Sequence, residues 1–315
     1  MFALCIEASH QRGMGHLFRM LNFSKTLVER GVPFRVVVNP DAVAEALLAK
    51  KMMPFDTVPM TSKSDWQTAL IRKHRIGVWI DDRLDTDAIH GSRVESCGVP
   101  RVTFDDRGPG AELADLNVVA MSFDNKEALP GRRVLRGTQY LVLNPDIRRY
   151  RRLRTSAGSI VVTMGGSDTY GVTEKVVRML KSIGRHATII AGPAFAHESD
   201  LVDLLDDGFV LKRNVPSLIE EFSHHGLAIT GGGVTPFEAN ASGLPCIVIA
   251  TEPFEIPVGM GIANFGGAVF AGHHSDIDAS LFSAALPIEK MSKAAMENID
   301  LGGAARVADQ IGGLF

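Results

Sequence analysis

The sequence predicts an α/β protein of two Rossmann-like domains, each built on an open parallel sheet. The first observation is a set of short continuous apolar runs such as Ser159-Ile-Val-Val-Thr163, typical of strands buried on both faces. The second is that amphipathic helical stretches alternate with these runs, which favours strand–helix–strand units with helices on both faces of each sheet. The third is that many of the 31 glycines follow apolar runs, as strand-to-loop turns do.

The elements can be placed along the chain. The first series of expected strands comprises 2–8, 34–38, 76–80, 100–104 and 116–120. The second series comprises 159–164, 187–191, 208–211, 227–230, 246–249 and 267–271. Helices are expected at 16–30, 40–52, 64–73, 86–97, 171–183, 215–223, 234–243, 256–265 and 301–312. The first helix shows the reasoning, because its apolar residues recur at helical spacing and Gly31 follows as a stop signal.

The two series meet between residues 122 and 158, and we place the domain boundary there, with domains 1–145 and 146–315. The last helix of the second domain is placed so that it can pack back on the first domain. Because ligands of such sheets bind at the carboxyl ends of the strands, we expect the two sheets to face each other across a cleft. Five arginines within 148–154 are interpreted as a solvated helix or linker in preference to a phosphate-attracting patch.

Composition narrows the class of protein. A net charge of −3 and a pI near 6.4 give no indication of a nucleic-acid or membrane surface. No stretch reaches the roughly 20 apolar residues of a membrane span. The three cysteines lie in or beside apolar runs, as reduced residues of a cytoplasmic protein do. The sequence carries no signal for an oligomeric state.

The first candidate loop is Gly13-Met-Gly-His-Leu-Phe-Arg19, which comes soon after the first strand and opens a helix. Gly13 and Gly15 let the backbone approach a ligand, and the helix start offers free N–H donors. His16 is suited to proton transfer near neutral pH, and Arg19 is suited to an anion or to orienting a partner. The dinucleotide pattern is excluded because Phe18 stands where its third glycine is needed.

Two further loops follow strands of the second domain. In Met164-Gly-Gly-Ser-Asp168, Gly165, Gly166 and Ser167 form a turn with acceptors for a helix N-cap. The other loop is Thr230-Gly-Gly-Gly-Val-Thr-Pro-Phe-Glu238. Three consecutive glycines before a helix favour close approach of the backbone to a phosphate. The candidate binding residues of this loop are Gly231, Gly232, Gly233, Val234, Thr235 and Glu238.

Paired acids and paired histidines complete the candidates. Asp81-Asp82 and Asp105-Asp106 each follow an expected strand and are interpreted as a metal site, a general-base pair or, more simply, caps of turns. We take Asp82, with His16, as the candidate catalytic residues. His224-His225 and His273-His274 lack further ligands at metal spacing and are expected at the surface.

Taken together, the three loops resemble the PseG/SpsG family of nucleotide-sugar enzymes, which has the GT-B fold. The marks are Gly-x-Gly-His-x-x-Arg, Gly-Gly-Ser-Asp and the triple-glycine loop followed by Ala241-Ser-Gly-Leu-Pro-Cys-Ile-Val-Ile249. Tyr140–Asp146 resembles the family's linker, and Asp300–Arg306 resembles its Asp-Gly-x-Gly-x-x-Arg with Leu301 in place of the first glycine. The resemblance covers nearly the whole chain.

The resemblance implies a UDP-sugar hydrolase like the UDP-2,4-diacetamido-2,4,6-trideoxy-β-L-altropyranose hydrolase of pseudaminic acid synthesis. By that resemblance the loop 231–235 holds the diphosphate and Glu238 the ribose. The backbone near Asn214 and Val215 meets the base, and His16 activates the attacking water. The substrate is then a UDP-sugar, and neither a metal nor a cofactor is required.

Two loops depart from the family's pattern. Glu252–Pro257 stands where the family has Asn-Gln, and Asp81–Asp85 lacks the tyrosine of Asp-x-Tyr. Two alternatives to hydrolysis therefore stay open. One is a GT-B glycosyltransferase that moves the sugar to a glycan or lipid acceptor. The other is a nucleotide-sugar-binding protein without catalysis.

Overall fold

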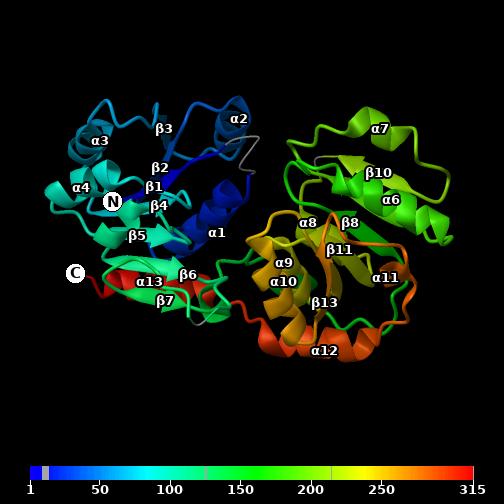
Figure 1. Cartoon of the computed structure of the whole chain (residues 1–315). Coiled ribbons are helices and arrows are strands. Elements are labelled where there is room, and N and C mark those ends of the chain that lie inside the picture. Colours follow the sequence, from blue (N-terminus) through cyan, green and yellow to red (C-terminus); the bar gives the residue numbers. More distant parts are fainter. Residues whose placement is uncertain (9–13, 125, 214, 315) are drawn as a thin grey trace. The chain divides into compact units, whose positions relative to one another are not determined.

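The structure is a computed structural model that describes residues 1–8, 14–124, 126–213 and 215–314. The chain forms two compact units. Unit 1 is Met1–Val142 together with Gly302–Phe315, and unit 2 is Leu143–Leu301. Each unit contains one sheet (Figure 1).

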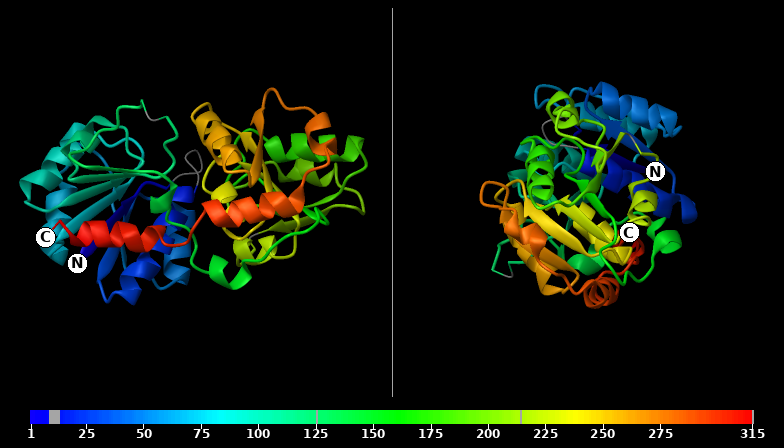
Figure 2. Two further views of the ribbon diagram at one scale, coloured as in Figure 1. Left: turned by 90° about the horizontal axis from the view of Figure 1, so that it is seen from below. Right: turned by 90° about the vertical axis from the view of Figure 1, so that its right-hand side faces the viewer.

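Unit 1 is built on a seven-stranded sheet whose paired strands all run parallel, in the order β3-β2-β1-β4-β5-β6-β7. Its strands are β1 (Phe2–Ile6), β2 (Phe34–Val38), β3 (Phe55–Thr57), β4 (Val78–Asp82), β5 (Arg101–Phe104), β6 (Leu116–Val119) and β7 (Val134–Arg136). Its α-helices are α1 (Gly15–Glu29), α2 (Ala42–Lys50), α3 (Trp66–His74), α4 (Ala88–Ser96) and α13 (Gly303–Gly312). Helix α13 packs beside α1 although it comes last in the chain (Figure 2).

Unit 2 is built on a six-stranded parallel sheet in the order β10-β9-β8-β11-β12-β13. Its strands are β8 (Ile160–Thr163), β9 (Ala187–Ala191), β10 (Val210–Arg213), β11 (Leu227–Gly231), β12 (Cys246–Ala250) and β13 (Ala268–His273). Its helices are α5 (Ile147–Tyr150), α6 (Val172–Ser182), α7 (Glu198–Val202), α8 (Leu218–Phe222), α9 (Thr235–Ala241), α10 (Glu255–Asn264), α11 (Ser280–Ser283) and α12 (Ile288–Asn298).

The strand order places a topological switch point in each sheet. In unit 1 the chain leaves β1 toward β2 and later returns to β4 on the other side of β1. In unit 2 it leaves β8 toward β9 and returns to β11. Ligands of open α/β sheets bind outside the carboxyl ends of the strands at such a point. All three candidate loops follow strands that flank a switch point.

The predicted fold class is confirmed, and every expected strand and helix is present. Strands β3 and β7 and helices α5, α7, α11 and α12 were not expected, because most of them are too short to show a hydrophobic period. One boundary matters for the site. The strand expected to end at residue 80 continues to Asp82, so Asp81 and Asp82 belong to β4 instead of to a loop.

Alternation along the central strands divides the core of unit 1. Leu4 of β1 and Ile80 of β4 lie in the cluster that packs against α1 and α13. Ala3 and Trp79 lie in the cluster on the opposite face, with Trp66 of α3. Because side chains of a strand alternate between faces, Asp82 shares the α1 face and Asp81 shares the α3 and α4 face.

Two residues expected at the surface of unit 2, Arg154 and His225, are buried. Arg154 is buried and donates to the backbone carbonyl groups of Arg152, Phe222, His225 and Ser242, so it anchors the chain inside unit 2 instead of facing solvent. His225, expected at the surface, is 5% exposed, and its Nδ1 lies 3.1 Å from Ser159 Oγ. A neutral imidazole fits here because burial and nearby cations penalise the charged form.

The stability of the protein is therefore expected to depend on His225 in mildly acidic solution. Burial lowers the pKa of His225 to about 4, from 6.5. The pKa of His225 is lower in the folded protein than in the unfolded chain. The contribution of the neutral imidazole to the free energy of unfolding is therefore complete above pH 6.5 and is lost as the pH falls toward 4. It amounts to at most about 3 kcal/mol.

Denaturant unfolding between pH 7.5 and 4 measures the effect. His225→Asn should flatten the loss of unfolding free energy over this range, because the titrating group is gone. The exposed neighbour provides the control, and His224→Asn should keep the wild-type slope. Equal slopes for wild type and His225→Asn would contradict the prediction.

Candidate functional site

The candidate catalytic residues of the sequence meet in unit 1. His16 lies in the first turn of α1, and its Nδ1 is 2.6 Å from Oδ1 of Asp82 at the end of β4. Because an ionised carboxylate only accepts, Nδ1 of the neutral ring carries the proton and Nε2 is left as an acceptor. Asp82 is fully buried, whereas the His16 side chain is 12% exposed. This is the arrangement of a histidine base that a carboxylate orients.

Arg19, one turn after His16, holds the other side of Asp82. Its Nε lies 2.7 Å from Oδ2 of Asp82, and its Nη2 lies 2.5 Å from Oδ1. Its Nη1 donates to Asp105, which follows β5. The guanidinium also lies over the ring of Phe104, 5.4 Å from the centroid. Arg19 therefore orients a partner and is not an ordinary surface arginine. His16, Arg19, Asp82 and Asp105 form one cluster that is buried except at His16.

The charge of Asp82 is maintained by its neighbours. Burial alone raises the pKa of a carboxyl group, but Arg19 and His16 outweigh burial and lower the pKa of Asp82 below its usual range. The same two acids, Asp82 and Asp105, raise the pKa of Arg19 against the effect of burial. The neighbours of this carboxylate thus favour its ionised form.

The acid pairs do not act as pairs. Asp81 points to the other face of β4, where Nε2 of His90 lies 2.9 Å from its Oδ1 and Arg101 Nε lies 2.7 Å from its Oδ2. Asp106 accepts from the backbone and hydroxyl of Thr86. Among the described residues, no three His, Cys, Asp or Glu side chains are grouped to hold a metal ion. The strand separates neighbouring carboxylates that the sequence placed together.

Of the two candidate glycines in the first loop, the structure describes Gly15. Gly13 lies outside the described residues. Gly15 opens α1, and a Cβ atom added there would meet no described atom within 4 Å. Packing against the described residues therefore does not require glycine at position 15.

In unit 2 the loop after β8 is a compact turn. Gly165 has a φ of +87°, a backbone conformation that favours glycine. The Gly166 carbonyl accepts from Ala194 N at 2.9 Å, and Ser167 Oγ lies 3.2 Å from Thr169 Oγ1. Asp168 accepts from the N–H groups of Val172 and Thr173 and so caps α6. Of the predicted roles, helix capping is the one this turn performs within the protein.

The triple-glycine loop lies beside that turn. A Cβ on Gly231 would be 3.7 Å from the carbonyl oxygen of Met164, so the loops after β8 and β11 are neighbours. Val234 and Thr235 begin α9, and Glu238 lies half-buried in its first turn. Asn214 lies outside the described residues, and Val215 is half-buried after β10.

Glu255, in the first turn of α10, is the residue that sequence reasoning missed. Its Oε2 accepts from Thr251 N, from Thr251 Oγ1 and from Glu252 N, at 2.7, 2.9 and 3.3 Å. A Cβ on Gly232 would lie 2.7 Å from the Glu255 Cβ, so the side chain packs against the glycine loop. The sequence signal for Glu255 was that it is an acid within Glu252–Pro257, the segment that departs from the family's pattern. At least one of the three glycines thus has a packing reason.

Aromatic and polar side chains cluster at the same end of the sheet. The Tyr170 hydroxyl donates to Glu252 at 2.7 Å, and its ring stacks on His274 with centroids 4.9 Å apart. The hydrogen bond to Glu252 raises the pKa of Tyr170, so the phenol stays protonated. The expected surface pair His273-His274 is thus tied to a tyrosine and an acid.

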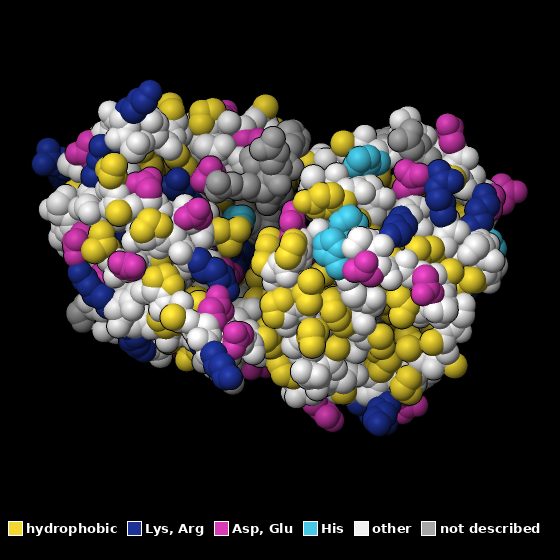
Figure 3. Space-filling model, in the orientation of Figure 1, with side chains coloured by type: hydrophobic (Ala, Val, Ile, Leu, Met, Phe, Trp, Pro, Cys, Tyr) yellow, Lys and Arg dark blue, Asp and Glu magenta, His cyan; other side chains and the backbone are white. Residues whose placement is uncertain are grey.

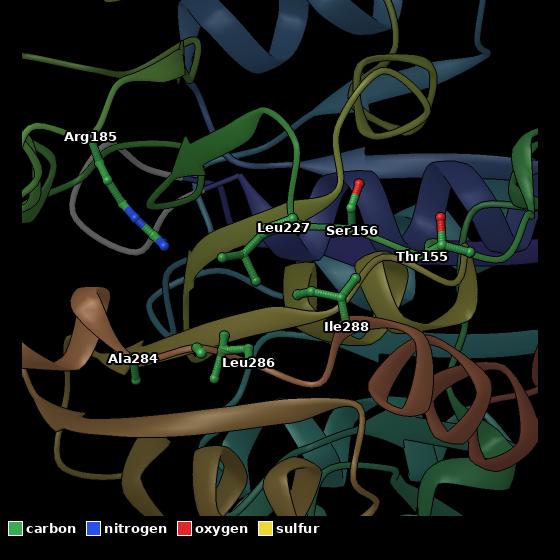
Figure 4. Close-up of a pocket in the computed structure, with 9 residues that line it drawn as sticks. Thr155, Ser156, Arg185, Leu227, Ala284, Leu286 and Ile288 are labelled. Atoms are coloured by element: carbon green, nitrogen blue, oxygen red, sulfur yellow. The ribbon is translucent and has the colours of Figure 1, made fainter.

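A cavity of about 220 Å³ lies elsewhere in unit 2. It is lined by Thr155–Ala157, Arg185, Leu227, Ala284–Leu286 and Ile288 (Figure 4). Leu227 begins β11, whereas the glycine loop follows the end of that strand. The cavity therefore lies at the amino ends of the strands, whereas the candidate residues lie at the carboxyl ends, so it is not part of their site.

Comparison with known proteins supports the resemblance. No model of a known protein family matches the chain. The chain is 24% identical over 269 residues to an uncharacterized protein of Methanocaldococcus jannaschii, covering 78% of this chain and 55% of that protein. It is 21% identical over 285 residues to the spore coat polysaccharide biosynthesis protein SpsG of Bacillus subtilis, and the match covers 84% of this chain and 82% of SpsG. The chain thus spans about half the length of the first relative.

Solved structures establish the fold. The MurG structure from Acinetobacter baumannii covers 99% of both chains with a TM-score of 0.69 and 15% identity. The S. aureus MnaA structure with UDP covers 98% of this chain and 95% of its own, with a TM-score of 0.64 and 13% identity. The chain is a GT-B-fold protein. In sequence the chain is thus similar to SpsG, and in fold it is similar to MurG and MnaA.

The glycine loop allows a test of packing. Gly232→Ala should destabilise unit 2 by about 1–3 kcal/mol, because its Cβ would overlap Glu255. Gly233→Ala is the matched control, since a Cβ there would be 3.9 Å from Oε1 of Glu255 and should cost under about 1 kcal/mol. Thermal unfolding of both variants measures the difference. Similar losses would show that Glu255 does not restrict position 232.

Proposed function

We propose that this protein is a UDP-sugar hydrolase of the PseG type. It would cleave the bond between UDP and a modified deoxy or acetamido sugar, with water as the acceptor, in the synthesis of a surface glycan or a nonulosonic acid. The observation that carries the proposal is the His16–Asp82 pair, a partly exposed imidazole whose Nδ1 is held by a buried carboxylate.

The chemistry follows from the tautomer of His16. Nε2, the free acceptor, takes a proton from water as the water oxygen attacks the anomeric carbon. The bond between that carbon and the diphosphate oxygen breaks, and UDP leaves with the electron pair. Asp82 stabilises the imidazolium that forms, as the acid of a catalytic triad does.

The nucleotide half of the proposal concerns unit 2. Parallel-sheet loops at a switch point, a glycine-rich backbone and the start of a helix favour a diphosphate. The proposed contacts are Gly165, Gly166 and Ser167 after β8, and Gly231–Thr235 with Glu238 after β11. MnaA, similar in fold, was solved with UDP. The proposed base contact lies near Asn214 and Val215.

The His16 role predicts a separation of binding from catalysis. His16→Ala should lower the rate of UDP release by about 10²-fold or more. UDP affinity should not change, because no proposed nucleotide contact is removed. Release of UDP from a panel of UDP-sugars without acceptor measures the rate, and calorimetry measures binding. In ¹⁸O-labelled water the label should enter the sugar. An unchanged rate for His16→Ala would contradict the mechanism.

One observation favours the glycosyltransferase as second candidate. Hydrophobic side chains gather on unit 2 over α10 (Figure 3), where Phe254 is 67% and Met260 55% exposed. An exposed apolar surface suits an amphipathic or lipid acceptor. None of the helices in the described part of the chain is long and apolar enough to cross a membrane. UDP release that requires an added acceptor would favour the transferase, and tight UDP-sugar binding without turnover would favour a binding protein.

Glu255 gives a test of the diphosphate position. A carboxylate against Gly232 repels a diphosphate bound to that loop, so Glu255→Gln should bind UDP about fivefold more tightly, for roughly 1 kcal/mol of repulsion removed. Calorimetry at low salt measures the change. Glu289→Gln, an exposed acid of α12 paired with Lys293, controls for net charge. Unchanged or weaker binding by Glu255→Gln would place the diphosphate elsewhere.

A further inference from the structure

The carboxyl ends of β4 and β5 carry two clusters of the same composition. The catalytic cluster is His16, Arg19, Asp82 and Asp105. The twin cluster, on the other face, is His90, Arg101, Asp81 and Asp106. In each, one arginine lies between two aspartates and one histidine contacts the aspartate of β4.

The twin cluster is closed. His90 is buried, and both of its ring nitrogens have partners, Asp81 on Nε2 and Gln67 on Nδ1. The catalytic cluster is open at His16, whose Nδ1 contacts Asp82 while the ring reaches solvent. The same set of charged groups therefore encloses His90 completely on the α3 and α4 face, whereas it leaves the ring of His16 partly exposed on the α1 face.

A charge count shows what Asp105 adds. Arg19 and Asp82 cancel each other, so with these two alone a protonated His16 would add an uncompensated positive charge. With Asp105 the cluster is negative by one when His16 is neutral and uncharged when His16 is protonated. Because Arg19, Asp82 and Asp105 are all buried, water screens this difference little.

Among the described residues of unit 1, the cations that neighbour Asp82 and Asp105 in the sequence pair with acids of their own. The start of α1 carries the positive end of its helix dipole, which disfavours an imidazolium. Arg83, next to Asp82, pairs with Glu7. Arg107, two residues after Asp105, pairs with Glu127. Asp105 is thus the charge that offsets Arg19.

The backbone at Asp105 shows that its position is held against a cost. Asp105 has a φ of +50°, which side chains other than glycine adopt at a penalty of about 1 kcal/mol or more. Its Oδ1 is buried and has no hydrogen-bond partner among the described residues. Stability alone favours neither feature, and this backbone conformation places the other carboxylate oxygen, Oδ2, against Arg19.

We propose that Asp105, acting through Arg19, is a positioning residue that supplies the negative charge on which protonation of His16 depends. The inference rests on the proposed role of His16 and goes beyond it. In each turnover His16 takes a proton from the attacking nucleophile. Asp105 lets that proton arrive without creating net charge inside the cluster.

Histidine NMR tests the proposal without any substrate. The ring signals of the protein are followed against pH, and His16→Ala identifies the signal of His16. Asp105→Asn keeps the shape of the side chain and tolerates the backbone conformation while removing the charge. It should lower the titration midpoint of His16 by about one unit or more. An unchanged midpoint would overturn the proposal.

Two further variants separate charge from packing. Asp105→Gly relieves the backbone and should lower the midpoint as Asp105→Asn does, even where it is the more stable of the two. Asp106→Asn removes an equally buried acid of the twin cluster, and it should cost stability while leaving the His16 midpoint in place. A midpoint that moved as much in Asp106→Asn would make the effect structural and overturn the proposal.

Activity distinguishes this inference from the proposed function. If His16→Ala abolishes UDP release, Asp105→Asn should lower kcat by about tenfold or more with KM unchanged, and the acidic limb of its pH profile should move to lower pH. Full activity of Asp105→Asn beside an inactive His16→Ala would overturn only the inference. Full activity of His16→Ala would instead remove the proposed function.

Discussion

The organisation of unit 1 depends on the burial of two consecutive carboxylates in its central strand. Asp81 and Asp82 end β4 on opposite faces, and each is fully buried. A buried carboxylate without partners is strongly unfavourable, so each face must supply a cation and a donor. Arg101 and His90 meet this need on one face, and Arg19 and His16 on the other. The second requirement fixes the first turns of α1 against β4, which orients His16.

Unit 2 meets a different constraint, the close approach of backbone to backbone. A Cβ on Gly192 would lie 2.4 Å from the Gly165 carbonyl oxygen, and one on Gly232 would overlap Glu255. These glycines allow the loops after β8 and β11 to lie close to their neighbours. Gly165 and Gly233 have more open surroundings. Glycine in these loops therefore has several origins: packing at Gly192 and Gly232, a positive φ at Gly165, and open surroundings at Gly233. Only open surroundings bear on the approach of a ligand.

The sequence predicted the layers because continuous apolar runs and helical periods are local signals. It also selected His16 and Asp82 as candidates, which lie near the carboxyl ends of β1 and β4, the two strands that flank the switch point. It could not predict that β4 extends to Asp82, since two consecutive acids look like a loop until their partners are known. Arg19, Arg101 and Asp105 find those partners 20 to 86 residues away in the chain, a separation that no local pattern encodes. Arg154 likewise has carbonyl partners 68 to 88 residues away. Glu255 bonds to nearby residues, but its contact with the glycine loop at Gly232 is not local in sequence.

The loops of unit 2 limit how a diphosphate can be recognised. None of the segments 164–171, 230–238 and 251–255 contains a lysine or arginine, and Glu252 and Glu255 add negative charge. Charge neutralisation by side chains is therefore unavailable within these loops. We infer that recognition there depends on amide N–H groups and helix starts, whose partial charges act at short range. Such binding is sensitive to the geometry of the loop and less sensitive to salt than binding by mobile cations, which screening weakens. For the proposed diphosphate contact, affinity then depends on how closely the glycines hold the backbone in place.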